Sequence, residues 1–417
     1  MKHWKIKLSL FLNYFVFAIL LNSVGTVILQ VINEYQIDPS SASVLEGYKD
    51  LSIAIASFLI ASYIPKFGYK KSMLAGLAFV TVAAIVMRLT GGFLMTKILF
   101  ATVGVSFALV KVSVYSTVGL ITDDSNEHSS FMNLLEGIFM IGVLLGYWLF
   151  GGFIDWANQT PGATWLDTYW VLAAISAAAF VLLIFTELDE SEVQADNQDI
   201  KKSFLEMVGL VRLPLVLIFI AGVFLYVYIE QGIGTWMPTF NNKILQLPDA
   251  MSVQVTSIFA ATTAIGRLAS GAVMKKVNWF WVLISCIASA MLLVVLVLPL
   301  TGGIEEGSVQ GWLTAPFAAY IFPLIGLFLA PIYPTLSSTV LSKLPKTKQS
   351  GMTGLIVIFS ALGGTTGSIF TGFMFDRLDG ITAFYLTLIP MGIMLLILFP
   401  YRRLRKNFEF ESLTEKD

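Results

Sequence analysis

Residues Leu8–Ile32 read LSLFLNYFVFAILLNSVGTVILQVI, an uncharged run that is long enough to cross a bilayer as a helix. Similar runs recur to the end of the chain, for example Leu283–Leu300 and Ala383–Pro400. Hydrophobic residues make up 56% of the chain and charged residues only 13%, so most of the chain is expected to lie in hydrocarbon. The sequence therefore predicts an all-α membrane protein.

Turn signals between the runs divide the chain into about twelve transmembrane helices. The predicted spans are 8–33, 42–64, 72–91, 94–121, 130–156, 167–186, 211–240, 251–274, 279–300, 314–342, 351–377 and 381–401. The first run is too long for the apolar part of a signal peptide, and no small-residue cleavage site follows it. It is therefore predicted to stay in the protein.

Lysine and arginine gather in alternate loops between these runs. The basic loops and tails hold Lys2, Lys5, Lys7, Lys66, Lys70, Lys71, Lys201, Lys202, Lys275, Lys276, Lys343, Lys346, Lys348, Arg402, Arg403, Arg405 and Lys406. Because basic loops stay on the cytoplasmic side, both termini are predicted to be cytoplasmic, with the chain in the inner membrane. The net charge of −1 gives no indication of a nucleic-acid partner. The single cysteine, Cys286, rules out an intramolecular disulfide, and no nucleotide-binding glycine loop is present. We expect no cofactor, no metal site and no enzymatic activity.

The polar stretch Glu187–Lys202 (ELDESEVQADNQDIKK) separates six predicted helices from six. The predicted organisation is an N-terminal bundle at 1–186, a cytoplasmic linker at 187–205, a C-terminal bundle at 206–401 and a cytoplasmic tail at 402–417. The halves also repeat, because a glycine or aspartate recurs 221 positions later at four places: Gly142, Gly146, Gly151 and Asp155 match Gly363, Gly367, Gly372 and Asp376. Two related bundles predict a binding site at their interface and rocking between inward-open and outward-open states. The glycines that lie four apart are predicted to pack helices closely.

With two six-helix halves and a central linker, the chain resembles the major facilitator superfamily. The signature of that superfamily between its second and third helices is a glycine, then Asp-Arg, then a glycine and two basic residues. Here Lys66, Gly68 and Lys70 match in kind, whereas Ala61 replaces the first glycine and Pro65 replaces the aspartate. The resemblance implies a cytoplasmic gate that includes Lys66, Gly68 and Lys70; the alternative is that these lysines act only as topology determinants.

Shorter motifs resemble one branch of the superfamily, the fucose–galactose/glucose–proton symporters. They are Leu21-Asn22-Ser23, Asn133-Leu134-Leu135-Glu136, Tyr228-Ile229-Glu230 with Gly234 and Trp236, Gly266-Arg267, and Tyr333-Pro334-Thr335. The resemblance implies a small-molecule site that includes Asn22, Asn133, Trp236 and Tyr333. The chain departs from the branch at Ser23, which replaces an acid associated with proton coupling. It also departs at Lys111, where the branch often has an acid, and at Lys49-Asp50, which replace aromatic residues.

Charged residues inside the spans are the main candidates for function, because a charge in hydrocarbon needs a partner or a polar cavity. Asp50 lies ten residues after Ser40, roughly 15 Å into the second span. Adjacent helical residues diverge by about 100°, so Lys49 and Asp50 point in different directions. Lys111 is also near mid-depth and is expected to pair with Asp50 or Glu136, or to contact the substrate. Lys49, Asp50, Lys111 and Glu136 form either a structural polar network or a site for substrate and coupling ion.

In the second half, Glu230, Gln231 and Trp236 could present a sugar-binding surface, because an indole face packs on a sugar ring and polar groups bind hydroxyls. The alternative is a glycine-weakened helix end that faces water. Arg267 is predicted to brace the inner gate or to extend to the inner surface. Asp155 and Asp376 are predicted at the outer ends of their helices, as interfacial or gate residues.

The predicted function is secondary active transport of a sugar or sugar derivative by cation symport. The coupling ion is a proton, or alternatively sodium, and because Ser23 replaces the first-helix acid, Asp50 is the first candidate for coupling and Glu230 the second. Lys49 and Lys111 favour an alternative, a carrier of organic anions or sugar acids. Two further alternatives are an exporter of drugs or amphiphiles and a non-transporting membrane sensor. The expected partners are the small-molecule substrate, the coupling ion and the lipid bilayer, with the protein as a monomer.

Overall fold

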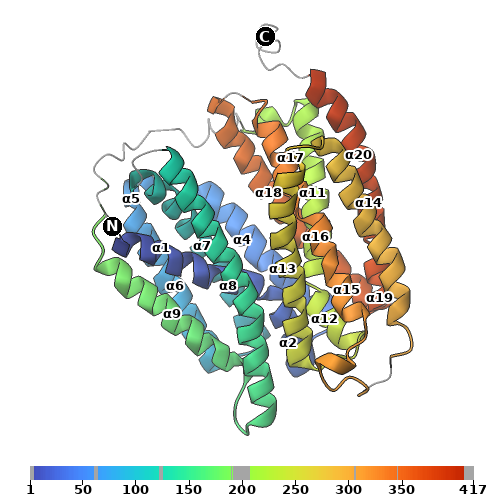
Figure 1. The fold of residues 1–417 in the computed structure, drawn as a ribbon. Coiled ribbons are helices and arrows are strands. Elements are labelled where there is room, and N and C mark those ends of the chain that lie inside the picture. Colours follow the sequence, from blue (N-terminus) through green and yellow to red (C-terminus); the bar gives the residue numbers. More distant parts are fainter. Residues whose placement is uncertain are drawn as a thin grey trace. The chain divides into compact units, whose positions relative to one another are not determined.

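The described part of the computed structural model consists of helices and their connections, with no strand among those residues. It comprises residues 4–60, 64–121, 125–188, 190, 207–304, 307–344 and 346–407, without the side chains of 65, 66, 119, 125–129, 133 and 346–351. Contacts divide the chain into two units: unit 1 is Met1–Asn197 with Pro248–Ser257, and unit 2 is Gln198–Leu247 with Ile258–Asp417. Figure 1 shows a bundle of helices in each unit.

The helices of the N-terminal half begin with two segments, α1 and α2, in place of one predicted span. In chain order they are α1 (Trp4–Asn22), α2 (Val24–Tyr35), α3 (Pro39–Ala42), α4 (Val44–Ile60), α5 (Ile64–Phe67), α6 (Tyr69–Thr90), α7 (Phe93–Ile121), α8 (Ser125–Gln159), the 3₁₀ turn η1 (Trp165–Asp167) and α9 (Thr168–Ile184). Within this half, α7 packs against both α4 and α6, and α1 packs against α8.

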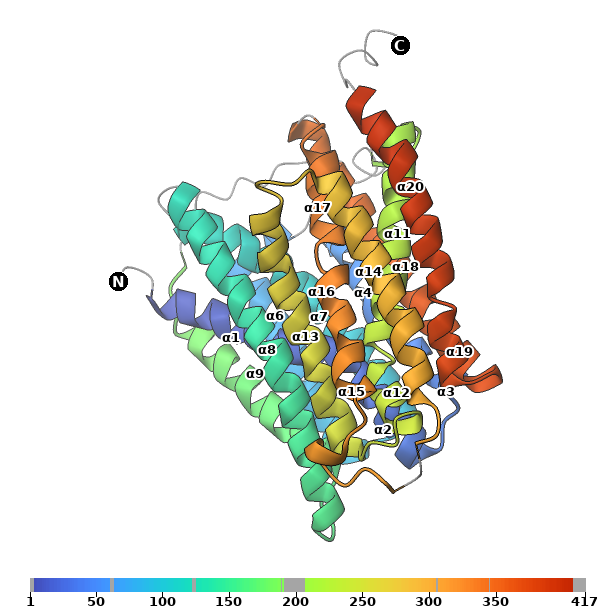
Figure 2. The same ribbon diagram turned by 45° about the vertical axis from the view of Figure 1, so that its right-hand side comes forward.

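The helices of the C-terminal half include more short segments. In chain order they are α11 (Pro214–Gly234), α12 (Met237–Lys243), α13 (Asp249–Val273), α14 (Trp279–Val297), η2 (Leu298–Thr301), η3 (Trp312–Thr314), α15 (Ala318–Ile321), η4 (Phe322–Leu324), α16 (Ile325–Leu329), α17 (Ile332–Leu341), α18 (Lys346–Arg377), α19 (Gly380–Tyr385) and α20 (Leu388–Asn407). Figures 1 and 2 both draw α18 and α20 beside α11, and both helices pack against it.

The predicted all-α membrane fold is confirmed, although the number of twelve spans is not fully confirmed. Among the described residues, 10 helices or helix pairs are long and apolar enough to cross a membrane, and they coincide with ten of the predicted spans. The other two predicted spans correspond to α4, which has 17 residues and carries three charges, and α13, which is long enough but more polar. The predicted linker at 187–205 lies mostly outside the described residues, so the domain boundary there stays a prediction.

The first, seventh, tenth and twelfth predicted spans are broken, and the prediction of a single helix was wrong for each; the twelfth breaks between α19 and α20. The first breaks at Ser23, whose hydroxyl donates to the Leu20 carbonyl oxygen at 2.8 Å and so competes with the helical backbone. The seventh breaks after Gly234, shortly before Pro238. The tenth contains Pro323 and Pro331, each of which removes a backbone donor from the helix.

Asp38 begins the short helix α3, which leads the chain into α4. Its carboxylate accepts from the Ser40 hydroxyl at 2.8 Å and from the Ser41 amide at 2.6 Å. These hydrogen bonds favour the charged form and hold the pKa of Asp38 below its usual value. The cap fixes where the helical path toward α4 begins.

Paired glycines bring helix backbones into contact at matching places in the two halves. A Cβ atom at Gly142 would collide with the backbone of Phe15, and a Cβ at Gly363 would collide with that of Phe224. Four residues later, Gly146 lies against Ile19 and Gly367 lies against Tyr228. The predicted packing role of these glycines is confirmed, and the repeat in the sequence is a repeat in helix packing.

Replacing one of these glycines with valine should therefore destabilise the protein. Because the new side chain would meet backbone atoms that cannot rotate away, we expect Gly142→Val and Gly363→Val to lower the free energy of unfolding by about 1–3 kcal/mol each. The measurement is the melting temperature of the purified protein in detergent. Gly152→Val on α8 is the control, since a Cβ there meets nothing within 4 Å. Equal melting temperatures for Gly142→Val and Gly152→Val would contradict the assignment.

Candidate functional site

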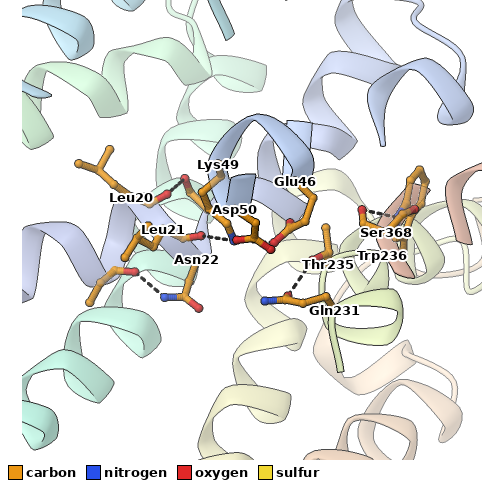
Figure 3. A network of polar contacts seen from close by, with 12 residues as sticks. Leu20, Leu21, Asn22, Glu46, Lys49, Asp50, Gln231, Thr235, Trp236 and Ser368 are labelled. Carbon is orange, nitrogen blue, oxygen red and sulfur yellow. Dashed lines mark hydrogen bonds and ion pairs between the residues drawn. The ribbon is translucent and has the colours of Figure 1, made fainter. Parts of the chain in front are cut away.

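Three charged residues of α4 form a compact group in unit 1, here called the Lys49 cluster: Glu46, Lys49 and Asp50. The Lys49 ammonium lies 2.5 Å from a Glu46 oxygen and 3.4 Å from an Asp50 oxygen. The exposed fractions of the side chains are 0% for Glu46, 7% for Lys49 and 13% for Asp50. Figure 3 shows the three side chains together at one side of their helix. The ammonium is thus shared unequally between two carboxylates.

The Lys49 cluster also reaches the break between α1 and α2. The Lys49 ammonium donates to the Leu21 carbonyl oxygen at 3.4 Å (Figure 3). Two further carbonyl oxygens near the break accept from side chains: that of Ala18 from the Asn22 amide, and that of Leu20 from the Ser23 hydroxyl, both at 2.8 Å. The last four carbonyl groups of a helix lack helical partners, and here the Ser23 and Lys49 side chains supply partners for those of Leu20 and Leu21. The charge state of α4 is therefore physically connected to the kink in the first span.

Glu46 was not among the residues predicted from the sequence. The available signal was its spacing, because a glutamate three residues before Lys49 lies on the same side of a helix. The prediction that Lys49 or Asp50 needs another partner agrees with the contact between Lys49 and Glu46. The prediction that the two side chains diverge is wrong, because their charged groups lie 3.4 Å apart.

A second polar group of unit 1, the Lys111 cluster, consists of Lys111, Tyr115 and Glu136. The Tyr115 hydroxyl donates to a Glu136 oxygen at 2.7 Å, which joins α7 to α8. The Lys111 ammonium lies 5.6 Å from the centre of the Phe107 ring and 5.9 Å from that of Tyr115. Glu136 is near enough for an electrostatic interaction with Lys111, but within the described residues Lys111 forms no ion pair. The predicted pairing of Lys111 with Asp50 or Glu136 is therefore absent from this conformation.

The Lys111 cluster is exposed although it lies on membrane-spanning helices. Lys111, Tyr115 and Glu136 are exposed, whereas Ser113 and Val114 on the packed face of α7 are buried. An ammonium at mid-span would cost at least about 2.5–3.5 kcal/mol if it faced lipid. Contact of this face of α7 with lipid is therefore unfavourable, and a polar environment is expected around the Lys111 ammonium.

Unit 2 contains a third charged group, the Glu230 cluster, formed by Tyr226, Glu230 and Arg267. The Tyr226 hydroxyl donates to a Glu230 oxygen at 2.7 Å, and the Arg267 guanidinium lies 3.9 Å from the same oxygen. The ring of Tyr333 lies 5.7 Å from that of Tyr226. The structure thus brings together Glu230, Arg267 and Tyr333, which the sequence placed in three separate motifs, and Arg267 is paired with Glu230.

Trp236 and Gln231 have different surroundings in unit 2. Trp236 is fully buried, stacks on Phe375, and donates its indole N–H to the carbonyl oxygen of Ser368 at 3.0 Å (Figure 3). This packing leaves neither an open ring face nor a free donor, so it does not favour the predicted contact between Trp236 and a sugar. The Gln231 side chain accepts from the Thr235 hydroxyl at 3.1 Å and is only partly buried.

The predicted inner-gate segment is held by contacts inside unit 1. The Lys70 amide donates to a Glu190 oxygen at 2.7 Å, which places a carboxylate at the start of α6. The Lys70 ammonium donates to the carbonyl oxygens of Ile184 and Thr186 at 3.0 and 2.6 Å. Gly68 has a φ of 98°, which favours glycine. The Lys70 ammonium therefore joins α6 to the end of α9, and the Lys70 amide binds Glu190, a residue that the sequence did not single out.

The remaining predicted site residues belong to none of these polar clusters. Asp155 and Asp376 are exposed near the ends of α8 and α18, as expected for interfacial residues. The side chains of Lys66 and Asn133 lie outside those described, so their roles stay predictions. No group of three or more His, Cys, Asp or Glu side chains in the described part of the chain could hold a metal ion.

Comparison with known proteins now identifies the family. The model of the Major Facilitator Superfamily matches residues 10–365. The chain belongs to the major facilitator superfamily. A comparison with curated protein sequences finds no match.

Several solved structures share the major facilitator fold with this chain. One is a bacterial homologue of the human lysosomal transporter Spinster, inward-facing and occupied, at a TM-score of 0.74 and 12% identity, with 95% of this chain and 96% of the other covered. Another is the nucleoside transporter NupG, at 0.70 and 13%, with 97% and 99% covered. The E. coli fucose:proton symporter FucP, as a single-residue variant, matches at 0.60 and 15%, with 96% and 99% covered. At these identities the likeness shows the fold alone.

As a member of this superfamily, the chain is a multi-pass transporter-type membrane protein, and its polar groups are candidates for a role in transport. The Lys111 cluster supplies donors and an acceptor on an exposed face. The Lys49 cluster and the Glu230 cluster each hold a carboxylate beside a cation. Each half therefore contains a carboxylate that a proton could neutralise.

The exposure of Lys111 can be tested by thiol labelling. In a Cys286→Ser background, a cysteine at Lys111 should react with a charged methanethiosulfonate reagent at least about tenfold faster than one at Ser113, because only a hydrated thiolate reacts. Ser113 is the matched control, since it lies on the same helix and is 0% exposed. The measurement is the labelling rate of the purified protein. Equally slow labelling at both positions would show that Lys111 does not line a water-filled pathway.

Proposed function

We propose that this protein is a secondary active transporter that carries a sugar or sugar derivative through a bilayer by proton symport. Membership of the major facilitator superfamily supports transport of a small molecule. The observation that carries the proposal is the Lys111 cluster, in which three polar side chains are exposed within apolar spans, with Lys111 near mid-depth. Polar groups at that depth are expensive in lipid and are expected along a substrate pathway.

A sugar fits this face because its hydroxyl groups both donate and accept hydrogen bonds. The Lys111 ammonium has three donor hydrogens, Glu136 provides an acceptor, and the exposed side chain of Asn22 on α1 can do both. The rings of Phe107 and Tyr115 add aromatic surface beside the ammonium. The motif resemblance to the fucose–galactose/glucose–proton symporters supports the same substrate class.

A sugar acid or another small organic anion is the second candidate. It is favoured by one observation, the lack of an ion pair at Lys111 within the described residues. A cation that protein carboxylates do not neutralise is suited to a substrate carboxylate.

Uptake into proteoliposomes separates the two candidates. The probes are labelled D-glucose, D-galactose, L-fucose and D-galacturonate, and Lys111→Met should reduce kcat/KM for the transported probe by about ten- to a hundredfold, as expected for a lost charged hydrogen bond. Lys111→Arg keeps the charge and should retain more uptake of D-galacturonate than Lys111→Met does. Lys97→Met is the control, because Lys97 lies on the same helix over the Phe93 ring. Normal uptake by Lys111→Met would reject the proposed substrate contact.

Coupling is proposed to use Asp50 first and Glu230 second. Asp50 is the most exposed of the three side chains in its cluster, at 13%, and lies beside a cation that can stabilise its charged form. Glu230 is 21% exposed and has both a hydroxyl donor and Arg267 nearby. Either carboxylate can alternate between a charged, partnered state and a neutral, protonated state.

The coupling proposal predicts that Asp50→Asn loses accumulation but keeps exchange. Exchange of labelled for unlabelled sugar at equal pH needs no net proton movement, whereas accumulation against a gradient does. The sugar used is the member of the panel that the wild-type protein takes up fastest, and Glu187→Gln, an exposed acid at the end of the N-terminal half, is the control. Full accumulation by both Asp50→Asn and Glu230→Gln would exclude proton symport through these residues and favour sodium coupling or uniport.

The protein is proposed to lie in the inner membrane as a monomer, with both termini in the cytoplasm. The proposed orientation rests on the distribution of lysine and arginine among the loops. A cysteine at Gln159 should then be labelled from outside intact cells and one at Glu187 should not, and the reverse pattern would invert the topology.

A further inference from the structure

The two carboxylates of the Lys49 cluster are not equivalent. Glu46 is 0% exposed and contacts the Lys49 ammonium at 2.5 Å, whereas Asp50 is 13% exposed and lies at 3.4 Å. The closer and fully buried pair is the stronger interaction, because attraction rises as distance and local dielectric constant fall. Asp50 therefore has a weaker interaction with the same ammonium, and its side chain is partly exposed.

Glu46 also acts on Asp50 directly. The two lie one turn apart on α4, so their carboxylates approach each other from the same side of the helix. A negative charge near Asp50 disfavours a second negative charge there. The cation and the neighbouring carboxylate therefore have opposite effects on the proton affinity of Asp50.

Among the residues that the structure describes, few other titratable groups face this pair. Tyr147 on α8 is near enough to Lys49 and Glu46 for an electrostatic interaction. On the other helices packed against α4, the titratable groups have their own contacts: Lys97 lies over Tyr48 and Phe93, Lys111 lies over Phe107 and Tyr115, Glu34 accepts from Trp165, and Tyr35 accepts from Gly92. Lys49 and Glu46 are thus the charged groups that act most strongly on Asp50.

We infer that Glu46 is a positioning residue for proton coupling: it holds the Lys49 ammonium, so that Asp50 is the carboxylate that binds and releases the proton. This inference rests on the proposed proton symport and adds a division of roles. In the step itself, a proton from water on one side of the membrane binds a carboxylate oxygen of Asp50 to give the neutral acid. Release to the other side restores the carboxylate. The ion pair between Glu46 and Lys49 keeps its charge throughout.

The inference predicts how the titration of Asp50 responds to changes at Glu46. Removal of the Glu46 charge deletes a repulsion and frees Lys49 to approach Asp50, and both effects stabilise the Asp50 carboxylate. Asp50 should then lose its proton at a lower pH, by about one to two pH units. Glu46→Asp keeps the charge and should titrate within about half a unit of the wild-type protein.

The experiment is an infrared titration of the full-length protein in lipid without any sugar, in which the carbonyl stretch of protonated carboxylic acids is followed against pH. A band that titrates in the wild-type protein should disappear in Asp50→Asn and shift to lower pH in Glu46→Gln. It should be preserved in Glu46→Asp and in the control Glu187→Gln. Persistence of the band in Asp50→Asn would overturn the inference, because Glu46 or another acid would then carry the proton.

An unshifted midpoint in Glu46→Gln would overturn it as well, because Glu46 would then have no influence on Asp50. Should Glu46→Gln fail to fold, Glu46→Asp and Asp50→Asn still decide the question, since a moved midpoint in the first or a surviving band in the second contradicts the assigned roles. The titration contains no solute, so its outcome is separate from the uptake assays. A protein that transports no sugar could still show the division of roles, and a sugar transporter could lack it.

Discussion

A charged group within hydrocarbon requires either a partner of opposite charge or access to water, and this constraint accounts for the polar interior of the protein. The short contact between Lys49 and Glu46 meets the first requirement, and the exposed face of Lys111 meets the second. The same helix bundle therefore contains one lysine whose ammonium is paired with carboxylates of the protein and one whose side chain is exposed.

Close packing of helix backbones supports these polar groups. In the N-terminal half, α8 lies on α1 through Gly142 and Gly146, and in the C-terminal half, α18 lies on α11 through Gly363 and Gly367. The Lys111 cluster uses α8, and the Glu230 cluster uses α11. Each of the two polar groups thus has one helix in a pair whose separation is fixed by backbone contact.

The sequence was sufficient for the fold class, the family and most of the spans, because apolar length and repeated glycines are local patterns that hydrocarbon enforces. It was less informative where a helix stops within a span. The break at Ser23 depends on a hydroxyl that binds its own backbone, and a serine in an apolar run can as well lie in a continuous helix. The contact partners of individual side chains were harder still to predict. Trp236 is of a residue type that often packs on sugar rings, but its indole N–H donates a hydrogen bond to Ser368, more than a hundred residues away in the chain. Glu46 was missed for the opposite reason, since its partner is three residues away and such pairs are common on ordinary helices.

The break at Ser23 has an electrostatic consequence for Lys49. The helix α1 ends at Asn22, inside the first predicted span, so the negative end of its backbone dipole, equivalent to about half an elementary charge, lies within the membrane. The Lys49 ammonium is 3.4 Å from one of the carbonyl oxygens at that end. Unlike a carboxylate, a helix terminus has no proton to gain or lose, so it attracts the ammonium equally at every pH. A lysine placed there would keep one constant partner even when a proton neutralises its neighbour Asp50, and the kink in the first helix provides that partner without adding another acid to the membrane interior.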